Sequence, residues 1–189
     1  MDDADWAAPL AAAGPVMVTG AAGFIGYHLC ERLLGAGVRV VGLDSLTPYY
    51  DPRLKRARLE RLRARPGFAF VEADLADGPA LDAAFADHRP GHVANLAAQA
   101  GVRHSIENPR AYADANLAGF VELLEACRRG AVRHLVYASS SSVYGGNTKI
   151  PFSERDAVDH PVSLYAATKK ANELMAHAHA HIHGLPATG

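Results

Sequence analysis

A tyrosine and a lysine four residues apart form the pair most able to do chemistry in this sequence. In Tyr165-Ala-Ala-Thr-Lys169, helical spacing places the phenol and the ammonium on one face, one turn apart. A cation beside a phenol favours the phenolate and lowers a pKa that is ordinarily near 10. Such a phenolate can take the proton of a sugar or alcohol hydroxyl near neutral pH. Pairs with this spacing are also common on helix surfaces, so the rest of the sequence has to decide.

Four consecutive serines supply hydroxyl groups that can work beside this pair. Ser139, Ser140, Ser141 and Ser142 lie at the end of an apolar run over residues 134–139 that predicts a strand. The carboxyl ends of the strands in an open α/β sheet face the ligand, so we expect a polar floor beside the helix of Tyr165. A serine-rich loop without a binding role is the alternative.

Three glycines near the start of the chain predict a loop that holds a pyrophosphate. They are spaced as GxxGxxG between a strand expected over residues 16–19 and a helix expected over residues 24–34. Glycine permits a tight turn and close backbone approach, and the N-terminus of the helix favours an anion. The predicted cofactor-binding residues of this loop are Gly20, Gly23, Phe24, Ile25 and Gly26.

Residues at the ends of the following strands complete the predicted dinucleotide site. Asp44 can accept both ribose hydroxyls of an adenosine, and its charge would repel a 2′-phosphate, so the sequence predicts NAD rather than NADP. Asp74 and Leu75 follow the third strand, where a carboxylate can reach the adenine amino group; a solvated loop acid is the alternative. Small residues after the fourth strand would let a flat cofactor lie against the backbone: Leu96, Ala97 and Ala98.

Apolar runs alternate with helical patterns, which predicts parallel strands joined by crossover helices. The fold class is therefore α/β, a Rossmann-type doubly wound parallel sheet with helices on both faces. Strands are expected over 16–19, 39–43, 69–72, 93–97 and 134–139, and helices over 24–34, 52–64, 80–88, 109–128 and 164–183. We expect residues 1–14 to be a loosely ordered Ala-rich extension, and residues 15–189 to be an NAD-binding domain that stops at its sixth strand.

Composition excludes several classes of function. The formal net charge is −1, which gives no global signal for nucleic acid or an anionic membrane. The sequence has no apolar run long enough to span a bilayer and no signal peptide at its start. The two cysteines, Cys30 and Cys127, lie in helical patterns and are expected to be buried free thiols, which suits a cytoplasmic protein.

Two groups of charged or ligating residues are predicted to have no functional role. The basic residues between Arg53 and Arg65 alternate with leucines and are interpreted as the solvated face of an amphipathic helix. His177, His179, His181 and His183 form two i,i+4 pairs. They have no acidic or cysteine neighbour in the sequence, so we expect no metal site.

Together the motifs resemble those of the extended short-chain dehydrogenases/reductases, and more closely those of the UDP-glucuronate 4-epimerases. The segments that carry the closer resemblance are Asp44-Ser-Leu-Thr-Pro-Tyr-Tyr-Asp-Pro-Arg-Leu-Lys55, Ala98-Gln-Ala-Gly-Val-Arg-His-Ser-Ile-Glu-Asn-Pro109 and Ser163-Leu-Tyr-Ala-Ala-Thr-Lys-Lys-Ala-Asn-Glu173. Asn95 departs from the pattern, since relatives usually carry His there. Relatives also continue with a C-terminal substrate domain that grips the nucleotide. The resemblance therefore implies that this chain lacks that domain and is inactive, or nearly so, by itself.

The resemblance implies NAD-dependent epimerisation at carbon 4 of a UDP-hexuronate, from UDP-glucuronate to UDP-galacturonate, through a transient 4-keto sugar. It implies that Tyr165 is the base, that Lys169 holds Tyr165 ionised and binds ribose hydroxyls, and that Ser140 relays the proton. The substrate-contacting residues would be Ser140, Ser141, Ser142, Tyr165 and, as an anion contact after the fourth strand, Arg103. It also implies a homodimer through the helices over residues 109–128 and 164–183.

Other functions remain open at this point. In the family, 4,6-dehydratases usually carry Asp-Glu after the residue matching Ser140, and decarboxylases of UDP-glucuronate typically carry a nearby Glu. This chain has Ser141 and Ser142 there, which favours an epimerase. The alternatives are a UDP-glucuronate decarboxylase, another nucleotide-sugar epimerase or dehydratase, or, for this chain alone, a non-catalytic NAD-binding module.

Overall fold

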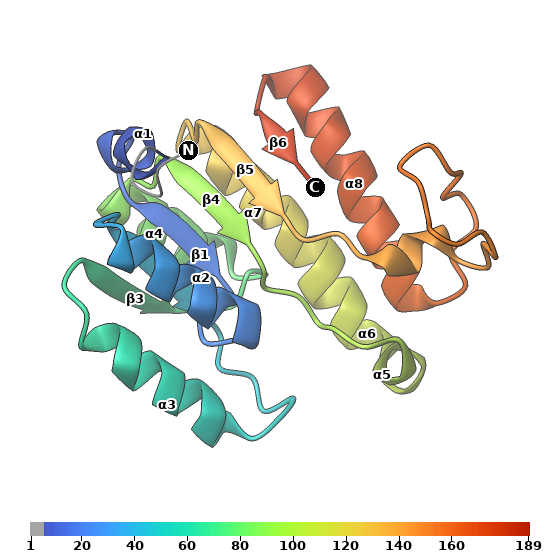
Figure 1. The fold of residues 1–189 in the computed structure, drawn as a ribbon, viewed down its shortest axis with the longest axis horizontal. Helices are drawn as coiled ribbons and strands as arrows, with labels where there is room; N and C mark the ends of the chain where they lie inside the picture. Colours follow the sequence, from blue (N-terminus) through green and yellow to red (C-terminus); the bar gives the residue numbers. More distant parts are fainter. Residues whose placement is uncertain (1–5) are drawn as a thin grey trace.

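Six parallel strands form one sheet (Figure 1). They run in the same direction because, after each strand, a connecting segment returns the chain to the end of the sheet where that strand began. The computed structural model describes residues 6–189. The strands are β1 (Val16–Thr19), β2 (Val40–Asp44), β3 (Phe68–Glu72), β4 (His92–Asn95), β5 (His134–Tyr137) and β6 (Ala187–Thr188). Their order across the sheet is β3-β2-β1-β4-β5-β6. This confirms the Rossmann-type fold predicted from the alternating pattern.

Helices cover both faces of the sheet, and each face has its own core. The helices are α1 (Ala7–Ala12), α2 (Phe24–Gly35), α3 (Pro52–Arg63), α4 (Gly78–His88), α5 (Val102–Glu107), α6 (Pro109–Tyr112), α7 (Gly119–Arg129) and α8 (Leu164–His183). One core joins α2 to β1 and β2, with Val18, Cys30 and Leu33 buried. The other joins α4 and α7 to the opposite face, with Leu81 and Leu123 fully buried.

The strand order reverses between β1 and β4, and ligands of such sheets bind outside the carboxyl ends at that point. The two strands pair so that Thr19 lies opposite Asn95. Thr19 Oγ1 donates to Asn95 Oδ1 over 2.5 Å and accepts from the backbone N–H of Ala97 over 3.1 Å. Asn95, the residue that departs from the family pattern, thus joins the ends of the two strands that flank the site.

The structure differs from the expected elements at the start of the chain, over residues 102–107, where α5 was not expected, and in the helix expected over residues 109–128. Residues 7–12 form α1, with Ala7 buried and Trp6 and Leu10 packed against the α2 core, so the described part of the start is ordered. Residues 1–5 lie outside the described residues. The single helix expected over 109–128 is divided into α6, a π-helical turn η1 (Ala113–Ala118) and α7. Sequence periodicity cannot show this, because apolar residues still recur at helical spacing on both sides of the turn.

Other expectations are confirmed. Cys30 and Cys127 are buried and free, and burial raises the pKa of each thiol to about 12, so both are unreactive at neutral pH. Within residues 6–189, none of the helices combines the length and the apolar character that a membrane span requires.

Candidate nucleotide and catalytic site

The glycine loop lies against the end of β4 so closely that side chains would not fit. Gly20 has a φ of +69°, and a Cβ there would come within 2.8 Å of the backbone nitrogen of Ala97. A Cβ on Gly26 would collide with the carbonyl oxygen of Gly20. Gly23 caps α2 in an extended conformation, and no described side chain bonds to this cap. The backbone N–H groups at the start of α2 are therefore free for an anion, as a pyrophosphate cradle requires.

A cavity of ≈ 210 Å³ opens beside this loop, at the carboxyl ends of β1, β2 and β4. It contains most of the residues predicted to bind the cofactor: Gly20, Gly23, Asp44, Asp74, Leu75, Leu96, Ala97 and Ala98. Gly26, Phe24, Ile25 and the Tyr165–Lys169 pair do not line it. Gly26 lies behind the loop, and the Phe24 and Ile25 side chains are exposed on α2. Residues that the sequence analysis did not assign complete the lining, among them Thr47, Tyr49, Tyr50, Lys55 and Gln99.

Asp44 is held by three hydrogen bonds before any ligand arrives. The backbone N–H of Ala22 donates to Oδ2 over 3.0 Å, and that of Leu46 donates to Oδ1 over 2.8 Å. Lys55 Nζ donates to Oδ1 over 3.1 Å, and both side chains are buried. A carboxylate offers about four acceptor positions, so about one remains. Asp44 can therefore accept one ribose hydroxyl, rather than two, without losing a partner.

The interpretation of the basic helix α3 as a solvated face is wrong for Lys55 and incomplete for Arg58. Lys55 is 7% exposed and pairs with Asp44. Arg58 donates to the carbonyl oxygen of Ala22 over 3.2 Å and to the hydroxyl of Tyr50 over 3.0 Å. Lys55 lines the cavity together with Thr47, Tyr49 and Tyr50 of the segment before α3, and Arg58 contacts the glycine loop at Ala22. The rest of the basic residues on α3 are solvated as predicted, for example Arg56 and Arg61.

The tyrosine and lysine lie in the first two turns of α8, which begins at the cap residue Ser163. Lys169 is buried, and its Nζ donates to the carbonyl oxygen of Ala138 at the end of β5 over 2.9 Å. Burial lowers the pKa of Lys169 to about 8, so the amine remains mostly protonated at neutral pH while being poorly solvated. The Tyr165 ring meets the buried Tyr112 ring edge to face, with centroids 6.1 Å apart.

The serines of residues 139–142 differ in their hydrogen-bond partners. Ser140 caps a short 3₁₀ helix, η2 (Ser141–Tyr144), and its Oγ lies 3.1 Å from the Oγ of Ser142. The η2 segment packs against α8, so these hydroxyls lie beside the helix of Tyr165. Ser139 Oγ instead donates to Glu173 on α8 over 2.6 Å. Ser141 is exposed, and Arg103 is exposed on α5, a helix that also packs against α8.

A buried polar network joins the cavity to α8, the helix that carries Tyr165 and Lys169. Asn116, in the π-helical turn η1, accepts from the backbone N–H of Gln99 over 2.8 Å and donates to the Gln99 carbonyl over 3.0 Å. It also donates to Thr168 Oγ1 over 3.1 Å, and its own carbonyl accepts from Asn172 over 2.6 Å. Gln99 lines the cavity, and Thr168 precedes Lys169. The network therefore sets the position of Tyr165 and Lys169 relative to the cavity.

These features define a class: a dinucleotide-binding α/β protein with a tyrosine–lysine pair on α8, a helix that a buried polar network connects to the cavity. The chain belongs to the NAD dependent epimerase/dehydratase family, whose model matches residues 16–189. The glycine cradle and the acid at the end of β2 fit the cofactor in the family's name.

Relatives narrow the comparison further. An uncharacterized 37.6 kDa protein of Escherichia coli O111:H- is 60% identical over 92% of this chain and 52% of its own length. A probable UDP-glucuronate 4-epimerase of Rhizobium meliloti is 52% identical over 91% of this chain and 50% of its own length. The crystal structure of UDP-glucuronic acid 4-epimerase from Bacillus cereus, in complex with UDP-glucuronic acid and NAD, matches with a TM-score of 0.84 and 32% identity, over 92% of this chain and 55% of that one. The chain thus spans about half the length of these relatives.

Proposed function

We propose that this chain is the NAD-binding and proton-transferring half of a UDP-glucuronate 4-epimerase. The observation that carries the proposal is the Tyr165–Lys169 pair on α8, with Lys169 buried against the end of β5 and the Ser140 and Ser142 hydroxyls beside the helix. The relative from Rhizobium meliloti and the structure from Bacillus cereus support the choice of UDP-glucuronate as substrate.

Three side chains perform the proton chemistry in this proposal. Tyr165, as phenolate, takes the proton of the sugar 4-hydroxyl, and it returns a proton when the 4-keto sugar is reduced on its other face. Lys169 stabilises the phenolate with its positive charge and binds ribose hydroxyls of the cofactor. Ser140 hydrogen-bonds the reacting oxygen and relays the proton. NAD, when bound, would supply a hydride acceptor for carbon 4 and return the same hydride, so no net oxidation would result.

Binding of the cofactor is assigned to the glycine loop and the cavity. The N-terminus of α2, with Gly20, Gly23 and Gly26, would hold the pyrophosphate. Asp44 and Lys55 would face the adenosine ribose, and Asp74 the adenine ring. Asp74 Oδ1 already accepts from the backbone N–H of Ala76 over 2.9 Å, which holds its carboxylate at the cavity wall.

The second candidate is a decarboxylase of the same substrate. The 4-keto form of a uronate is a β-keto acid, which loses CO₂ when its carboxylate turns perpendicular to the carbonyl plane. Hydroxyl donors from Ser141 and Ser142 would hold the carboxylate away from that geometry. Neither position carries an acid, so the residues favour epimerisation.

The test uses a complete protein that contains this chain together with the remaining half found in its relatives. Incubation with UDP-glucuronate should give UDP-galacturonate, measured by chromatography, with no released CO₂ and no net NADH. UDP-xylose as the main product would establish the decarboxylase. No conversion by the complete protein, with NAD bound, would support the non-catalytic module.

Cofactor selectivity tests the pairing of Asp44. The chain should bind NAD at least about tenfold more tightly than NADP, because a 2′-phosphate would meet the buried carboxylate of Asp44. Lys55 offsets part of that repulsion, so the preference is smaller than an unpaired acid would give. Asp44→Asn should narrow the gap, as measured by fluorescence titration of both cofactors.

Asp74→Asn is the matched control, since Asp74 is the other acid of the cavity wall and should leave the NAD to NADP ratio unchanged. An NADP preference in the unmodified chain, or an equal effect of the two substitutions, would contradict the role given to Asp44.

We also propose a homodimer through α7 and α8, which lie side by side (Figure 1). Two apolar side chains of the region over residues 109–128, Tyr112 and Leu124, are buried within the chain itself. Val121, Leu174 and Ile182 remain exposed and would form the contact.

Leu174→Glu should convert a dimer to a monomer at micromolar concentration, as measured by light scattering, because a charge would be buried in the contact. Ile106→Glu, at an exposed position on α5, is the control and should leave the dimer intact. A monomeric unmodified protein would refute the proposal.

We propose that the protein works in the reducing cytoplasm, because its two cysteines are buried and free.

A further inference from the structure

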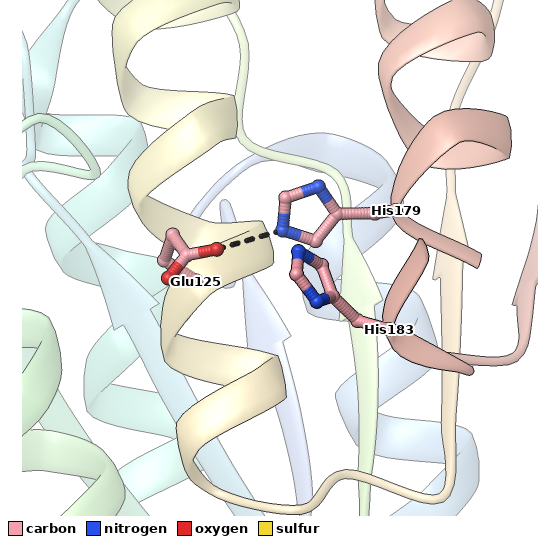
Figure 2. Close-up of side chains that lie close together, drawn as sticks. All are labelled: Glu125, His179 and His183. Carbon is pink, nitrogen blue, oxygen red and sulfur yellow. Dashed lines mark hydrogen bonds and ion pairs between the residues drawn. The ribbon is translucent and has the colours of Figure 1, made fainter. Parts of the chain in front are cut away.

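Three side chains that can ligate a metal converge between α7 and α8, away from the nucleotide cavity. They are Glu125, His179 and His183, and one ligand atom from each lies within 4.8 Å of the others. Figure 2 shows the two imidazole rings, one turn apart on α8, facing the carboxylate on α7. The prediction that these histidines have no role rested on the lack of an acidic neighbour in the sequence, and the fold brings one to His179: its Nε2 lies 2.9 Å from Glu125 Oε1. Sequence spacing could not reveal this, since the partner lies 54 positions earlier.

We propose that Glu125, His179 and His183 form a site for a divalent transition metal, with Zn²⁺ as the ion that fits best. Two imidazole nitrogens and one carboxylate oxygen are ligands that Zn²⁺ uses, with water as a fourth. Ligand atoms on a shared tetrahedral Zn²⁺ lie about 3.3 Å apart, given bonds of about 2.0–2.1 Å. The 2.9 Å contact is already close to this, and His183 is an exposed side chain at the end of α8 that can adjust.

The two oxygens of Glu125 have different partners, and Oε1 is the one that faces α8. Arg128 and Arg129 both donate to Oε2, over 2.7 Å and 3.5 Å. Oε1 faces His179 and also accepts a hydrogen bond from Arg128 Nε over 3.2 Å. The arginines hold the carboxylate in place toward α8, while Zn²⁺ would replace the proton between Oε1 and His179. His183 is the last residue of α8, where the helix dipole favours a cation.

The neighbouring pair His177 and His181 provides an internal comparison. It has the same i,i+4 spacing on the same helix, and both side chains are exposed. Among residues 6–189, Glu125, His179 and His183 form a cluster of potential metal ligands. In the same part of the chain, His177 and His181 belong to no such cluster with a carboxylate or cysteine. A metal bound at the proposed site would connect α7 to α8, whereas one bound by His177 and His181 would contact α8 alone. The ion would thus stabilise the packing of the two helices.

The experiment measures Zn²⁺ binding to the chain prepared without a histidine tag. Competition with a chromophoric chelator should give one Zn²⁺ per chain with a micromolar or lower Kd. At 100 times that Kd, Zn²⁺ should raise the Tm by about 5 °C or more. His183→Ala and Glu125→Gln should each weaken binding at least tenfold and remove the Tm shift. His177→Ala and His181→Ala, the matched controls, should leave both unchanged.

Co²⁺ substitution gives a readout of geometry, since a tetrahedral site shows intense visible absorption. The proposal is overturned if Zn²⁺ binds no more tightly than millimolar, or if His181→Ala weakens binding as much as His183→Ala. It is also overturned if Zn²⁺ binds without raising the Tm, because the ion would then not connect the two helices. Circular dichroism of each metal-free variant separates lost ligands from lost folding; His183 is exposed, so its replacement should leave the fold intact.

Discussion

Replacing Tyr165 with phenylalanine is expected to lower the kcat of the complete enzyme by roughly 10³- to 10⁴-fold. The change removes the phenolic oxygen that would take the proton of the sugar 4-hydroxyl in the proposed mechanism, while the ring can keep its edge-to-face contact with Tyr112. NAD affinity should change little, because Lys169 and the glycine loop are untouched. Turnover of UDP-glucuronate is the measurement, with NAD binding measured on the same preparation.

Two further variants locate the effect at the site. Ser140→Ala should cost less, on the order of 10²-fold, because a positioned proton relay is lost while the base remains. Tyr27→Phe is the matched control, since Tyr27 is buried on α2 in the core of the other sheet face. If Tyr165→Phe keeps kcat within about tenfold of the unmodified enzyme, the role of Tyr165 as a general base is wrong.

Replacing Gly26 with alanine is expected to remove most of the NAD affinity of this chain and to destabilise it. The added Cβ would collide with the carbonyl oxygen of Gly20 and approach the Cα of Ala21 to 3.0 Å. These contacts are backbone, so the loop has to move. Overpacking of this kind costs about 1–3 kcal/mol. The corresponding loss of NAD affinity is roughly 10- to 100-fold, because the same shift misplaces the pyrophosphate cradle.

Gly35→Ala is the control for this effect. Gly35 lies at the other end of α2, and a Cβ there would meet its nearest neighbour, Arg65, only at 4.0 Å. Isothermal titration with NAD and thermal unfolding should therefore show a loss for Gly26→Ala alone. Normal NAD binding by the Gly26 variant would mean that the cradle lies elsewhere.

Features set by local sequence were the ones predicted well. The bounds of α8 were predicted to the residue, because Ser163 caps its start by accepting from the N–H of Ala166 and Gly184 ends it in the left-handed conformation. The glycine loop and Asp44 were found because a strand, a turn and a helix follow one another within a short segment. These features depend on residues that are close together in the sequence, so the residue types and their spacing are enough to predict them.

Features set by tertiary contacts were missed. Lys55 has the sequence surroundings of a solvated lysine, and only the approach of α3 to the end of β2 buries it against Asp44. His179 has no acidic neighbour in sequence, yet the packing of α8 on α7 brings Glu125 to it. Helix α1 was also missed, because an Ala-rich start that contains Pro9 is typical of a loop. The packing of Trp6 and Leu10 against the core around α2, which stabilises this helix, is not visible in the sequence.

The π-helical turn η1 has a consequence for insertions and deletions. A π turn holds one residue more than an α turn, so residues 113–118 act as a one-residue insertion in an otherwise regular helix. Deleting a single codon there would restore an unbroken α-helix, in which the two halves keep their faces while residues of the turn itself move around the axis by up to roughly 100°. Asn116 would then leave Gln99 and Thr168, although every apolar residue of α7 was still present. The extra residue and the polar network are therefore expected to be retained or lost together. The number of residues in this helix matters for the position of Asn116 as much as the identity of the residues does.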